Sequence, residues 1–574
     1  MVVVSSRRGS SLGRPSPIVL AALAAVVLLV VLFVVLTGGP PAEQQRAERF
    51  VEAWARADYP AMHAELTPAA RAARPVADFT ADYREAAAIA TATAFRPGKV
   101  GDPKDGIVSV PMTVVTRAFG AVRATLRLPF AGEGDDARIA WSQNLTFPGV
   151  QRGQRLERSM KLPRRADILA RDGTPLAAGD DRGSPLGAFA TAISGDLGPA
   201  PAEDAERLRS RGVPDDAQVG LTGLERVFQD DVAGRPGGTL RAGTVQLARS
   251  TPRAASAVRT SIDPKIQRAA VESLGAQYGG VAVVRPRTGE ILGLAGVAFS
   301  SLQPPGSTFK IVTLSGALEN RLAGPRSTYP VQTSASLEGV EIENANGESC
   351  GGSLRLSFAH SCNSVFAPLG ARLGPERLVK IAEAFGFNQD LGIPGAATSL
   401  IPAADEIGDS LAVGSSAIGQ GRVQATALQM AWVASTIAEG GRRVPLTLRT
   451  GVRPLPKRVI RAGTARIVRA YMEAVVQVGT GAAAAIGGVR VAGKTGTAEL
   501  KTTSTPDCTP APGVECPPAE PEDPTDTDAW FAAFAPANRP RIAVGVLLIA
   551  NGAGGATAAP VARQVLTASL KATG

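Results

Sequence analysis

The stretch Pro304-Pro305-Gly306-Ser307-Thr308-Phe309-Lys310 places a serine hydroxyl and a lysine amine three residues apart. Prolines and a glycine are tolerated at a helix entry but not in its interior, so they predict that a helix begins here. Ser307 and Lys310 would then share one helix face. A serine becomes a nucleophile when a neighbour accepts its proton, and a lysine can do so when burial or nearby positive charge lowers the pKa of its amine. The pair alone is a weak signal, because Ser-x-x-Lys also occurs by chance at solvated helix starts.

Two later stretches complete a pattern. Ser361-Cys362-Asn363 follows the first pair along the chain, and Lys494-Thr495-Gly496-Thr497 follows further on. Ser-x-x-Lys, then Ser-x-Asn, then Lys-Thr-Gly is the ordered set described for penicillin-binding proteins and serine β-lactamases. Each motif is weak by itself, but three in this order form a strong joint signal. The chain therefore resembles a class B penicillin-binding protein, a monofunctional D,D-transpeptidase of cell-wall synthesis.

This resemblance implies a serine acyl-enzyme mechanism on a D-Ala-D-Ala stem peptide of peptidoglycan. Ser307 would attack the carbonyl of the penultimate D-Ala, and a neutral Lys310 would accept its proton. Ser361 would relay a proton towards the leaving D-Ala amine. Asn363 would hold Lys310 and the substrate amide by hydrogen bonds. Which of Lys310 and Ser361 moves each proton cannot be read from the sequence.

The third motif would bind the substrate. By resemblance, Lys494 supplies positive charge for the terminal carboxylate, and the hydroxyls of Thr495 and Thr497 flank Gly496 and bind the same group. The backbone N–H groups of Ser307 and Thr497 would form the oxyanion hole. An amine from a neighbouring stem peptide would then resolve the acyl-enzyme, whereas β-lactam antibiotics would mimic the substrate and stall at the acyl stage.

Three alternative functions share these motifs. A serine β-lactamase would not need the membrane anchor, spacer and pedestal that the rest of the chain indicates. A D,D-carboxypeptidase differs only in its acceptor, water instead of an amine, and the sequence leaves this choice open. A β-lactam sensor or a cell-wall assembly scaffold would keep the fold without catalysis, but the three intact motifs weigh against a scaffold and the short N-terminal tail weighs against a sensor.

One motif points to another class of function. Residues 488–495 match Gly-x-x-x-x-Gly-Lys-Thr, the phosphate-binding loop of NTPases. That loop requires a preceding strand, a compact glycine turn and a following helix. Here the intervening residues alternate like a strand, and a Pro-rich segment follows instead of a helix. We therefore expect Lys494 to lie on a strand, outside any nucleotide site.

The composition limits the classes of partner and cofactor that we expect for this chain. Hydrophobic residues make up 44% and charged residues 20% of the chain, as in ordinary globular proteins. The net charge of +10 fits either an ordinary basic surface or attraction to anionic wall polymers and membrane headgroups. No basic run interleaved with aromatic residues indicates nucleic acid. The chain has two histidines, His63 and His360, which is a weak basis for a Ser-His-Asp triad or a histidine metal site. We therefore expect no metal and no cofactor.

The four cysteines are Cys350, Cys362, Cys508 and Cys516. An even number in an exported chain permits two disulfides with three possible pairings. We favour Cys350 with Cys362 and Cys508 with Cys516. The first bridge would hold the loop of the second motif, since Cys362 occupies its middle position. Four free thiols remain the alternative, and zinc-ligand spacing is absent.

The N-terminus predicts a membrane anchor. Arg7, Arg8 and Arg14 precede the uncharged apolar run of residues 18–36, which is 19 residues long. This length spans a bilayer as a helix, and the flanking charges place residues 1–17 in the cytoplasm and the remainder outside. A cleaved signal peptide is the rival reading, but no small-x-small cleavage site follows cleanly. We expect a single-pass protein of the cytoplasmic membrane, with other cell-wall synthesis proteins among its partners.

Residues 41–150 are expected to form a separate α+β domain. Apolar residues recur at helical spacing from about Ala42. Residues 107–117 and 122–130 alternate like two paired strands, and a third strand is expected between Ile139 and Pro148. The aromatic positions resemble those of the NTF2-like N-terminal domain of the PBP2a-type subgroup. Such a domain would act as a spacer that lifts the catalytic domain off the membrane.

Residues 151–260 are polar and rich in Arg, Gly and Pro. Residues 165–173 resemble an Arg-Gly-x-Ile-x-Asp-Arg-x-Gly stretch of the family, although Ala166 and Ala170 replace its Gly and Asp. Gly223-Leu224-Glu225 resembles a second stretch of the same domain. The resemblance implies a pedestal, often called a dimerisation domain.

The catalytic domain is expected at residues 261–574. The fold class is α+β, a serine β-lactamase/transpeptidase-like domain with a five-stranded antiparallel sheet between helical layers. The apolar patterns predict strands at 281–284, 291–294, 489–500, 530–534 and 542–549, and helices at 267–274 and 560–571.

Overall fold

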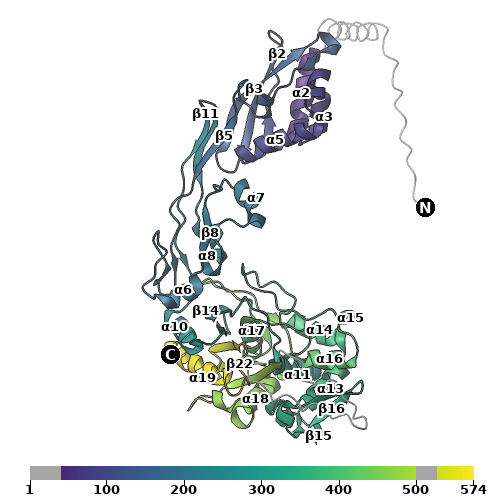
Figure 1. Cartoon of the computed structure of the whole chain (residues 1–574), viewed down its shortest axis with the longest axis vertical. Helices are drawn as coiled ribbons and strands as arrows, with labels where there is room; N and C mark the ends of the chain where they lie inside the picture. Colours follow the sequence, from purple (N-terminus) through teal and green to yellow (C-terminus); the bar gives the residue numbers. More distant parts are fainter. Residues whose placement is uncertain (1–39, 500–526, 574) are drawn as a thin grey trace, which may run out of the picture. The chain divides into compact units, whose positions relative to one another are not determined.

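The computed structural model describes residues 40–499 and 527–573 (Figure 1). The predicted cytoplasmic tail, the predicted membrane helix at 18–36, and Cys508 and Cys516 lie outside these residues. Within the described ranges, no helix is both long enough and apolar enough to cross a bilayer. The chain divides into two compact units. The first holds Met1–Pro163, Ala202–Asp215 and Arg235–Arg253, and the second holds Arg164–Pro201, Asp216–Gly234 and Ala254–Gly574.

The first unit packs helices against an antiparallel sheet with strand order β1-β2-β3-β4. Along β2 every second side chain is buried, which gives the sheet one apolar face. The helices cover that face with fully buried aromatic side chains such as Phe50, Phe79 and Tyr83. The elements are α2 (Ala42–Ala55), α3 (Tyr59–Ala64), α4 (Pro68–Ala73), α5 (Val76–Ala90), β1 (Ala92–Pro97), β2 (Ile107–Thr116), β3 (Gly120–Ala131), η1 (Gly134–Asp136) and β4 (Arg138–Ile139).

The strand predicted from Ile139 to Pro148 is wrong. The structure has the two-residue strand β4 and then a 3-10 turn, η2 (Gln143–Thr146). The buried Tyr83 hydroxyl donates to the Leu145 carbonyl at 3.2 Å and accepts from Trp141 Nε1 at 3.1 Å. The apolar residues that suggested a strand therefore lie on a turn and pack into the core from there. The Tyr83 hydroxyl, not a neighbouring strand, hydrogen-bonds to the backbone at Leu145.

The predicted pedestal segment, residues 151–260, is shared between the two units. In the first unit, α7 (Ala202–Ser210) accompanies a sheet of order β11-β10-β5, made of β5 (Leu156–Lys161), β10 (Gly237–Ala242) and β11 (Val245–Ser250). The remaining pieces belong to the second unit: β6 (Ile168–Leu169), β7 (Pro175–Ala177), α6 (Ala188–Ser194), β8 (Leu197–Pro199), β9 (Gln218–Gly220), α8 (Gly223–Val227), α9 (Gln229–Val232) and β12 (Val258–Arg259).

The two stretches that resembled a pedestal meet in the second unit. Glu225 is 1% exposed, and its carboxylate accepts from Arg165 Nε and from Arg182 Nε, each at 2.6 Å. A buried carboxylate needs such partners, since an unpaired charge away from water is costly. Arg165 and Glu225 are therefore structural partners in this segment.

The second unit is built around a five-stranded antiparallel sheet, as the family resemblance implied, and its strand order is β14-β13-β23-β22-β21. Successive side chains of a strand point to opposite faces. Val281 and Val283 pack with α10 and α19 on one face, whereas Ala282 and Val284 join the core that contains α11 (Lys310–Glu319) and α17. The elements are α10 (Pro264–Leu274), β13 (Gly279–Arg285), β14 (Glu290–Gly296), α17 (Ala427–Ala438), β21 (Ala492–Glu499), β22 (Thr527–Ala535), β23 (Ile542–Leu548) and α19 (Ala558–Ala572).

Helices and small hairpins complete the second unit beside the sheet. They are η3 (Gly306–Phe309), α11 (Lys310–Glu319), β15 (Thr328–Gln332), β16 (Ser334–Leu337), β17 (Val340–Glu343), η4 (Ala345–Gly347), β18 (Cys350–Ser353), α12 (Leu354–Ala359), α13 (Asn363–Leu373), α14 (Pro375–Ala384), α15 (Ala404–Ile407), α16 (Ser410–Ala417), β19 (Arg442–Arg443), β20 (Lys457–Arg458), α18 (Ala462–Val478) and η5 (Ala482–Ala484). β16 pairs with β17, and β15 pairs with β18.

Candidate active site

The first motif lies where the chain enters α11. Ser307 sits on the 3-10 turn η3, and Lys310 is the first residue of the α-helix. Gly306 has φ +49°, and a Cβ there would lie 2.5 Å from the Thr497 carbonyl oxygen. Only glycine suits this left-handed, crowded position. The absence of a side chain lets the turn that carries Ser307 lie directly against β21, the strand of the third motif.

The second motif approaches from the turn between α12 and α13. Ser361 has φ +63°, an uncommon conformation for a residue with a side chain. Lys310 Nζ donates to the Ser361 carbonyl oxygen and to Asn363 Oδ1, each at 2.6 Å, and lies 3.3 Å from Ser361 Oγ. The lysine of the first motif is therefore held by both polar residues of the second.

The third motif closes the site from the edge of the sheet. Lys494 lies on β21, and its Nζ donates to Ser361 Oγ at 2.8 Å. Ser361 Oγ thus lies between two lysine amines. The phosphate-loop alternative does not fit this placement, because residues 492–499 form one continuous strand paired with β22.

Burial controls the charge of both amines. Lys310 and Lys494 are 0% exposed, and their Nζ atoms lie 5.8 Å and 5.6 Å from the rings of Phe366 and Phe358, respectively. Burial, reinforced by the nearby charge of Lys494, holds the pKa of Lys310 well below its usual value. Burial lowers the pKa of Lys494 to about 7. Burial therefore favours the neutral amine of Lys310, the form that accepts a proton.

The remaining residues of the third motif line the same strand. Thr497 is partly exposed, and its Oγ1 accepts from the Gly554 N–H at 3.4 Å. Thr495 is buried, and its Oγ1 lies 2.6 Å from Thr480 Oγ1. A Cβ at Gly496 would lie 2.7 Å from the Pro305 carbonyl oxygen, so this glycine also permits the close contact with the first motif.

Sequence reasoning missed Thr480. Its backbone N–H donates to the Ala359 carbonyl at 3.1 Å, so this residue joins the end of α12 to the hydroxyl of Thr495. Thr480 belongs to none of the three motifs, and no spacing rule distinguishes it from the other threonines of the chain. Only the fold brings it to the site.

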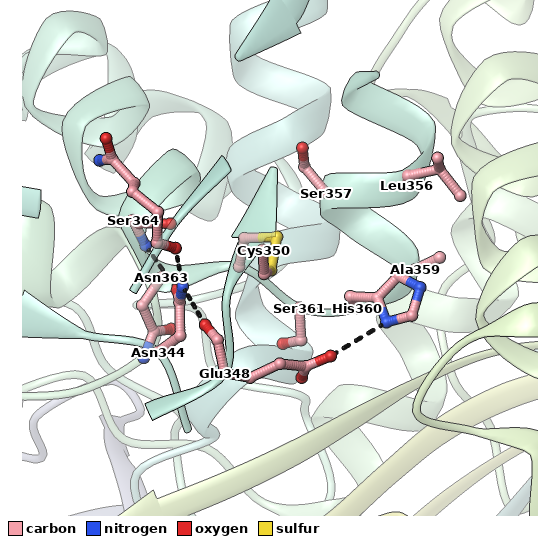
Figure 2. Close-up of a disulfide and its surroundings, with 12 residues drawn as sticks. Asn344, Glu348, Cys350, Leu356, Ser357, Ala359, His360, Ser361, Asn363 and Ser364 are labelled. Carbon is pink, nitrogen blue, oxygen red and sulfur yellow. Dashed lines mark hydrogen bonds and ion pairs between the residues drawn. A yellow bond between two sulfur atoms is a disulfide. The ribbon is translucent and has the colours of Figure 1, made fainter. Parts of the chain in front are cut away.

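A disulfide supports the second motif. Cys350 and Cys362 are bonded, which is the pairing favoured from the sequence (Figure 2). The bond joins the start of β18 to the residue between Ser361 and Asn363. Beside it, His360 Nδ1 lies 3.4 Å from Glu348 Oε1, so His360 contacts an acidic loop residue. Across residues 40–499 and 527–573, no cluster of His, Cys, Asp or Glu is placed to hold a metal ion.

We expect this disulfide to contribute measurably to stability. Closing a loop with a sequence separation of 12 restricts the unfolded chain and is worth about 3 kcal/mol. Replacing both Cys350 and Cys362 by serine should lower the calorimetric midpoint of the second unit by roughly 5 °C. A thiol reductant should lower the wild-type midpoint by more than that of the double variant, which keeps only Cys508 and Cys516. Equal midpoints for the two oxidised proteins would contradict the prediction.

The fold and the three motifs together define a serine enzyme of the acyl-enzyme class, with a buried lysine three residues after the serine of the first motif. Comparison with known proteins agrees. Residues 279–567 match the family model described as the penicillin binding protein transpeptidase domain. The chain belongs to this family.

Relatives and solved structures are consistent with this assignment. The chain is 32% identical over 380 residues to peptidoglycan D,D-transpeptidase PbpA of Mycobacterium tuberculosis, covering 55% of this chain and 72% of that protein. The PbpA of Mycolicibacterium smegmatis is also 32% identical, over 372 residues, with the same shares covered. Among structures, the D,D-transpeptidase domain of a peptidoglycan glycosyltransferase from Eggerthella lenta aligns with TM-score 0.57 and 27% identity, over 72% of this chain and 100% of that one. The ceftriaxone acyl-enzyme of M. tuberculosis penicillin-binding protein A aligns with TM-score 0.55 and 27% identity, over 71% and 98%.

Proposed function

We propose that this chain is a peptidoglycan D,D-transpeptidase that crosslinks stem peptides through an acyl-serine intermediate and is acylated by β-lactams. The observation that carries the proposal is the position of Lys310. Its amine is buried, and the pKa of this amine lies well below its usual value. The amine is hydrogen-bonded to both Ser361 and Asn363, and Lys310 follows Ser307 by about one helical turn. The names of the relatives, peptidoglycan D,D-transpeptidases, support the substrate class.

The amine geometry explains how Ser307 becomes a nucleophile. A neutral lysine amine has two hydrogens and one lone pair. Both hydrogens are used, since Nζ donates to the Ser361 carbonyl and to Asn363 Oδ1. The lone pair is then left to accept the Ser307 proton as the hydroxyl attacks the penultimate D-Ala carbonyl. Ser361 Oγ contacts both lysines and passes a proton to the nitrogen of the departing D-Ala.

The third motif binds the substrate at the edge of the sheet. Among residues 40–499 and 527–573, β21 pairs only with β22 within the sheet, so its outer edge can accept an extended peptide. Lys494 and the hydroxyls of Thr495 and Thr497 receive the terminal carboxylate. The N–H groups of Ser307 and Thr497, brought close by the Gly306 contact, stabilise the oxyanion. One such donor is typically worth about 3 kcal/mol in the transition state.

The second half-reaction determines the product. An amine of a neighbouring stem peptide attacks the acyl-serine carbonyl, the Ser307–acyl bond breaks, and the serine oxygen regains a proton. A new amide crosslink forms. A β-lactam acylates Ser307 by opening its ring, but its leaving nitrogen stays attached to the acyl group. The acyl-enzyme therefore persists.

The remaining regions fit a membrane-anchored wall enzyme. We propose that residues 18–36 span the cytoplasmic membrane, with 1–17 in the cytoplasm and the catalytic domain outside. Residues 41–150 would be an NTF2-like spacer and 151–260 a pedestal. The helices and curved antiparallel sheet of the first unit support the spacer assignment. A membrane location also favours contact with other cell-wall synthesis proteins.

Intact-mass spectrometry with benzylpenicillin tests the proposal. We expect one stable adduct that maps to the peptide containing Ser307, and a D-Ala-D-Ala stem peptide with an added amine acceptor should yield the crosslinked product. Hydrolysis of the stem peptide without crosslinking would favour a D,D-carboxypeptidase. A transient adduct with rapid drug turnover would favour a β-lactamase. No adduct and no product would favour a non-catalytic scaffold.

A further inference from the structure

The second motif begins α13, and the start of this helix lacks its usual cap. The N-cap residue of α13 is Cys362, which makes no capping hydrogen bond through its side chain. Helix starts normally use Ser, Thr, Asp or Asn to accept from an early N–H group. Here the cysteine sulfur is committed to the disulfide with Cys350. The first free N–H groups of α13 must therefore find acceptors elsewhere.

Asn344, from the loop after β17, supplies that acceptor. Its Oδ1 accepts from the Ser364 N–H at 2.9 Å, in the first turn of α13 (Figure 2). Its Nδ2 donates to the Gln332 carbonyl at 2.8 Å and to the Glu348 carbonyl at 2.9 Å. Asn344 is 4% exposed, and its carboxamide has a partner for both hydrogens and for the oxygen. It therefore fixes its own loop and the helix start to each other.

The neighbouring backbone sets the orientation of Asn363. Asn363 Nδ2 donates to the Glu343 carbonyl at 2.8 Å. A carbonyl oxygen only accepts, so the amide nitrogen must face Glu343 and the amide oxygen must face the opposite way. That oxygen is the one that accepts from Lys310 Nζ at 2.6 Å. The position of the Glu343 carbonyl thus decides which atom of Asn363 meets the lysine.

We propose that Asn344 is a positioning residue for the acylation step. It caps α13 from a neighbouring loop and fixes the Glu343 carbonyl that directs the Asn363 oxygen onto Lys310. The inference rests on the proposed function, because it concerns how the lysine amine is aimed at Ser307. Asn344 touches neither substrate nor nucleophile, and it acts through Asn363 and Ser364.

The test measures acylation of the full chain by benzylpenicillin over a range of concentrations, which separates the rate constant of acylation from the apparent binding constant. Asn344→Leu keeps the side-chain size and removes the hydrogen bonds. We expect the acylation rate constant to fall about tenfold and the binding constant to change less than twofold. Asn344→Asp keeps the acceptor for Ser364 but places a carboxylate oxygen against the Gln332 and Glu348 carbonyls, so its rate constant should fall at least as far. This variant is the fallback should Asn344→Leu not fold.

Asn388→Leu is the matched control. Its carboxamide also bridges backbone groups, since Nδ2 donates to the Ile401 carbonyl at 2.9 Å and Oδ1 accepts from the Ile401 N–H at 3.0 Å. None of these groups belongs to the three motifs. We expect Asn388→Leu to lower the melting temperature without changing the acylation rate constant of the folded protein.

A double-mutant comparison shows whether Asn344 acts through Asn363. In an Asn363→Ala background, Asn344→Leu should change the acylation rate constant by less than about twofold, because coupled residues are not additive. A further tenfold fall in that background, or a wild-type rate constant in Asn344→Leu alone, would overturn the inference. A wild-type chain that never acquires an adduct would instead overturn the proposed function on which it rests.

Discussion

Lys310→Met is expected to slow acylation by benzylpenicillin about 10³-fold while the chain remains folded. A positioned general base contributes typically about 10²–10⁴-fold. Methionine has a similar length and suits a fully buried site. Burial keeps the pKa of Lys310 well below its usual value and so favours the neutral amine, which the uncharged methionine replaces. The main loss is the proton acceptor that we propose for Ser307, and stopped-flow or mass-resolved acylation kinetics would measure it.

Lys380→Met is the matched control for this substitution. Lys380 is exposed on α14 in the same unit and makes no contact with the three motifs among the residues that the structure describes. Its variant should acylate at the wild-type rate.

The wild-type acylation rate should also fall at low pH, where Lys310 becomes protonated, and this acid limb should be missing from Lys310→Met. Acylation of Lys310→Met within tenfold of the wild type would exclude Lys310 as the main base.

Local patterns were enough to predict the core of the catalytic unit. The two short apolar runs at 281–284 and 291–294, separated by a turn, predict the hairpin that the structure shows as β13 and β14. The alternation around Lys494 likewise predicts β21. A short apolar run bounded by turn residues is a property of one segment, so it can be read without knowing the neighbouring strands. The prolines before Ser307 mark the helix entry for the same local reason.

Contacts between distant segments could not be read in this way. The bond from Lys494 to Ser361 joins residues 133 positions apart, and only the family resemblance indicated that these two motifs meet. Thr480 and Asn344 belong to none of the three motifs. Each acquires its role because the folded chain places its side chain against a group of a motif. The residues next to a threonine or an asparagine in the sequence do not predict such a contact.

The failed strand between Ile139 and Pro148 has the same physical origin. Apolar side chains alternate there, but strand formation also requires free backbone partners on a neighbouring strand. The Tyr83 hydroxyl takes the Leu145 carbonyl instead. The disulfide shows the limit of cysteine counting: four cysteines allow three pairings, and the bond of Cys350 to Cys362 becomes definite only when the fold brings the start of β18 against the start of α13.

Lys494 is expected to set the alkaline limit of activity. Burial lowers its pKa to about 7, so the amine is charged below this pH and neutral above it. Only the charged form attracts the carboxylate of a stem peptide or a penicillin. The second-order acylation rate constant reports the groups of the free enzyme, and we expect it to fall about tenfold between pH 6 and pH 8 as Lys494 loses its proton.

Lys494→Arg separates charge from other roles of this residue. A guanidinium stays charged throughout this range, so the variant should lose the alkaline limb, although its larger head group in a fully buried site should lower the rate at every pH. Lys494→Ala should acylate about 10²-fold more slowly than the wild type at pH 6 and should also lack the limb near pH 7. The acid limb, which belongs to Lys310, should persist in both variants. An alkaline limb that stays near pH 7 in Lys494→Arg would assign the titration to another group, because an arginine at this position has no proton to lose there.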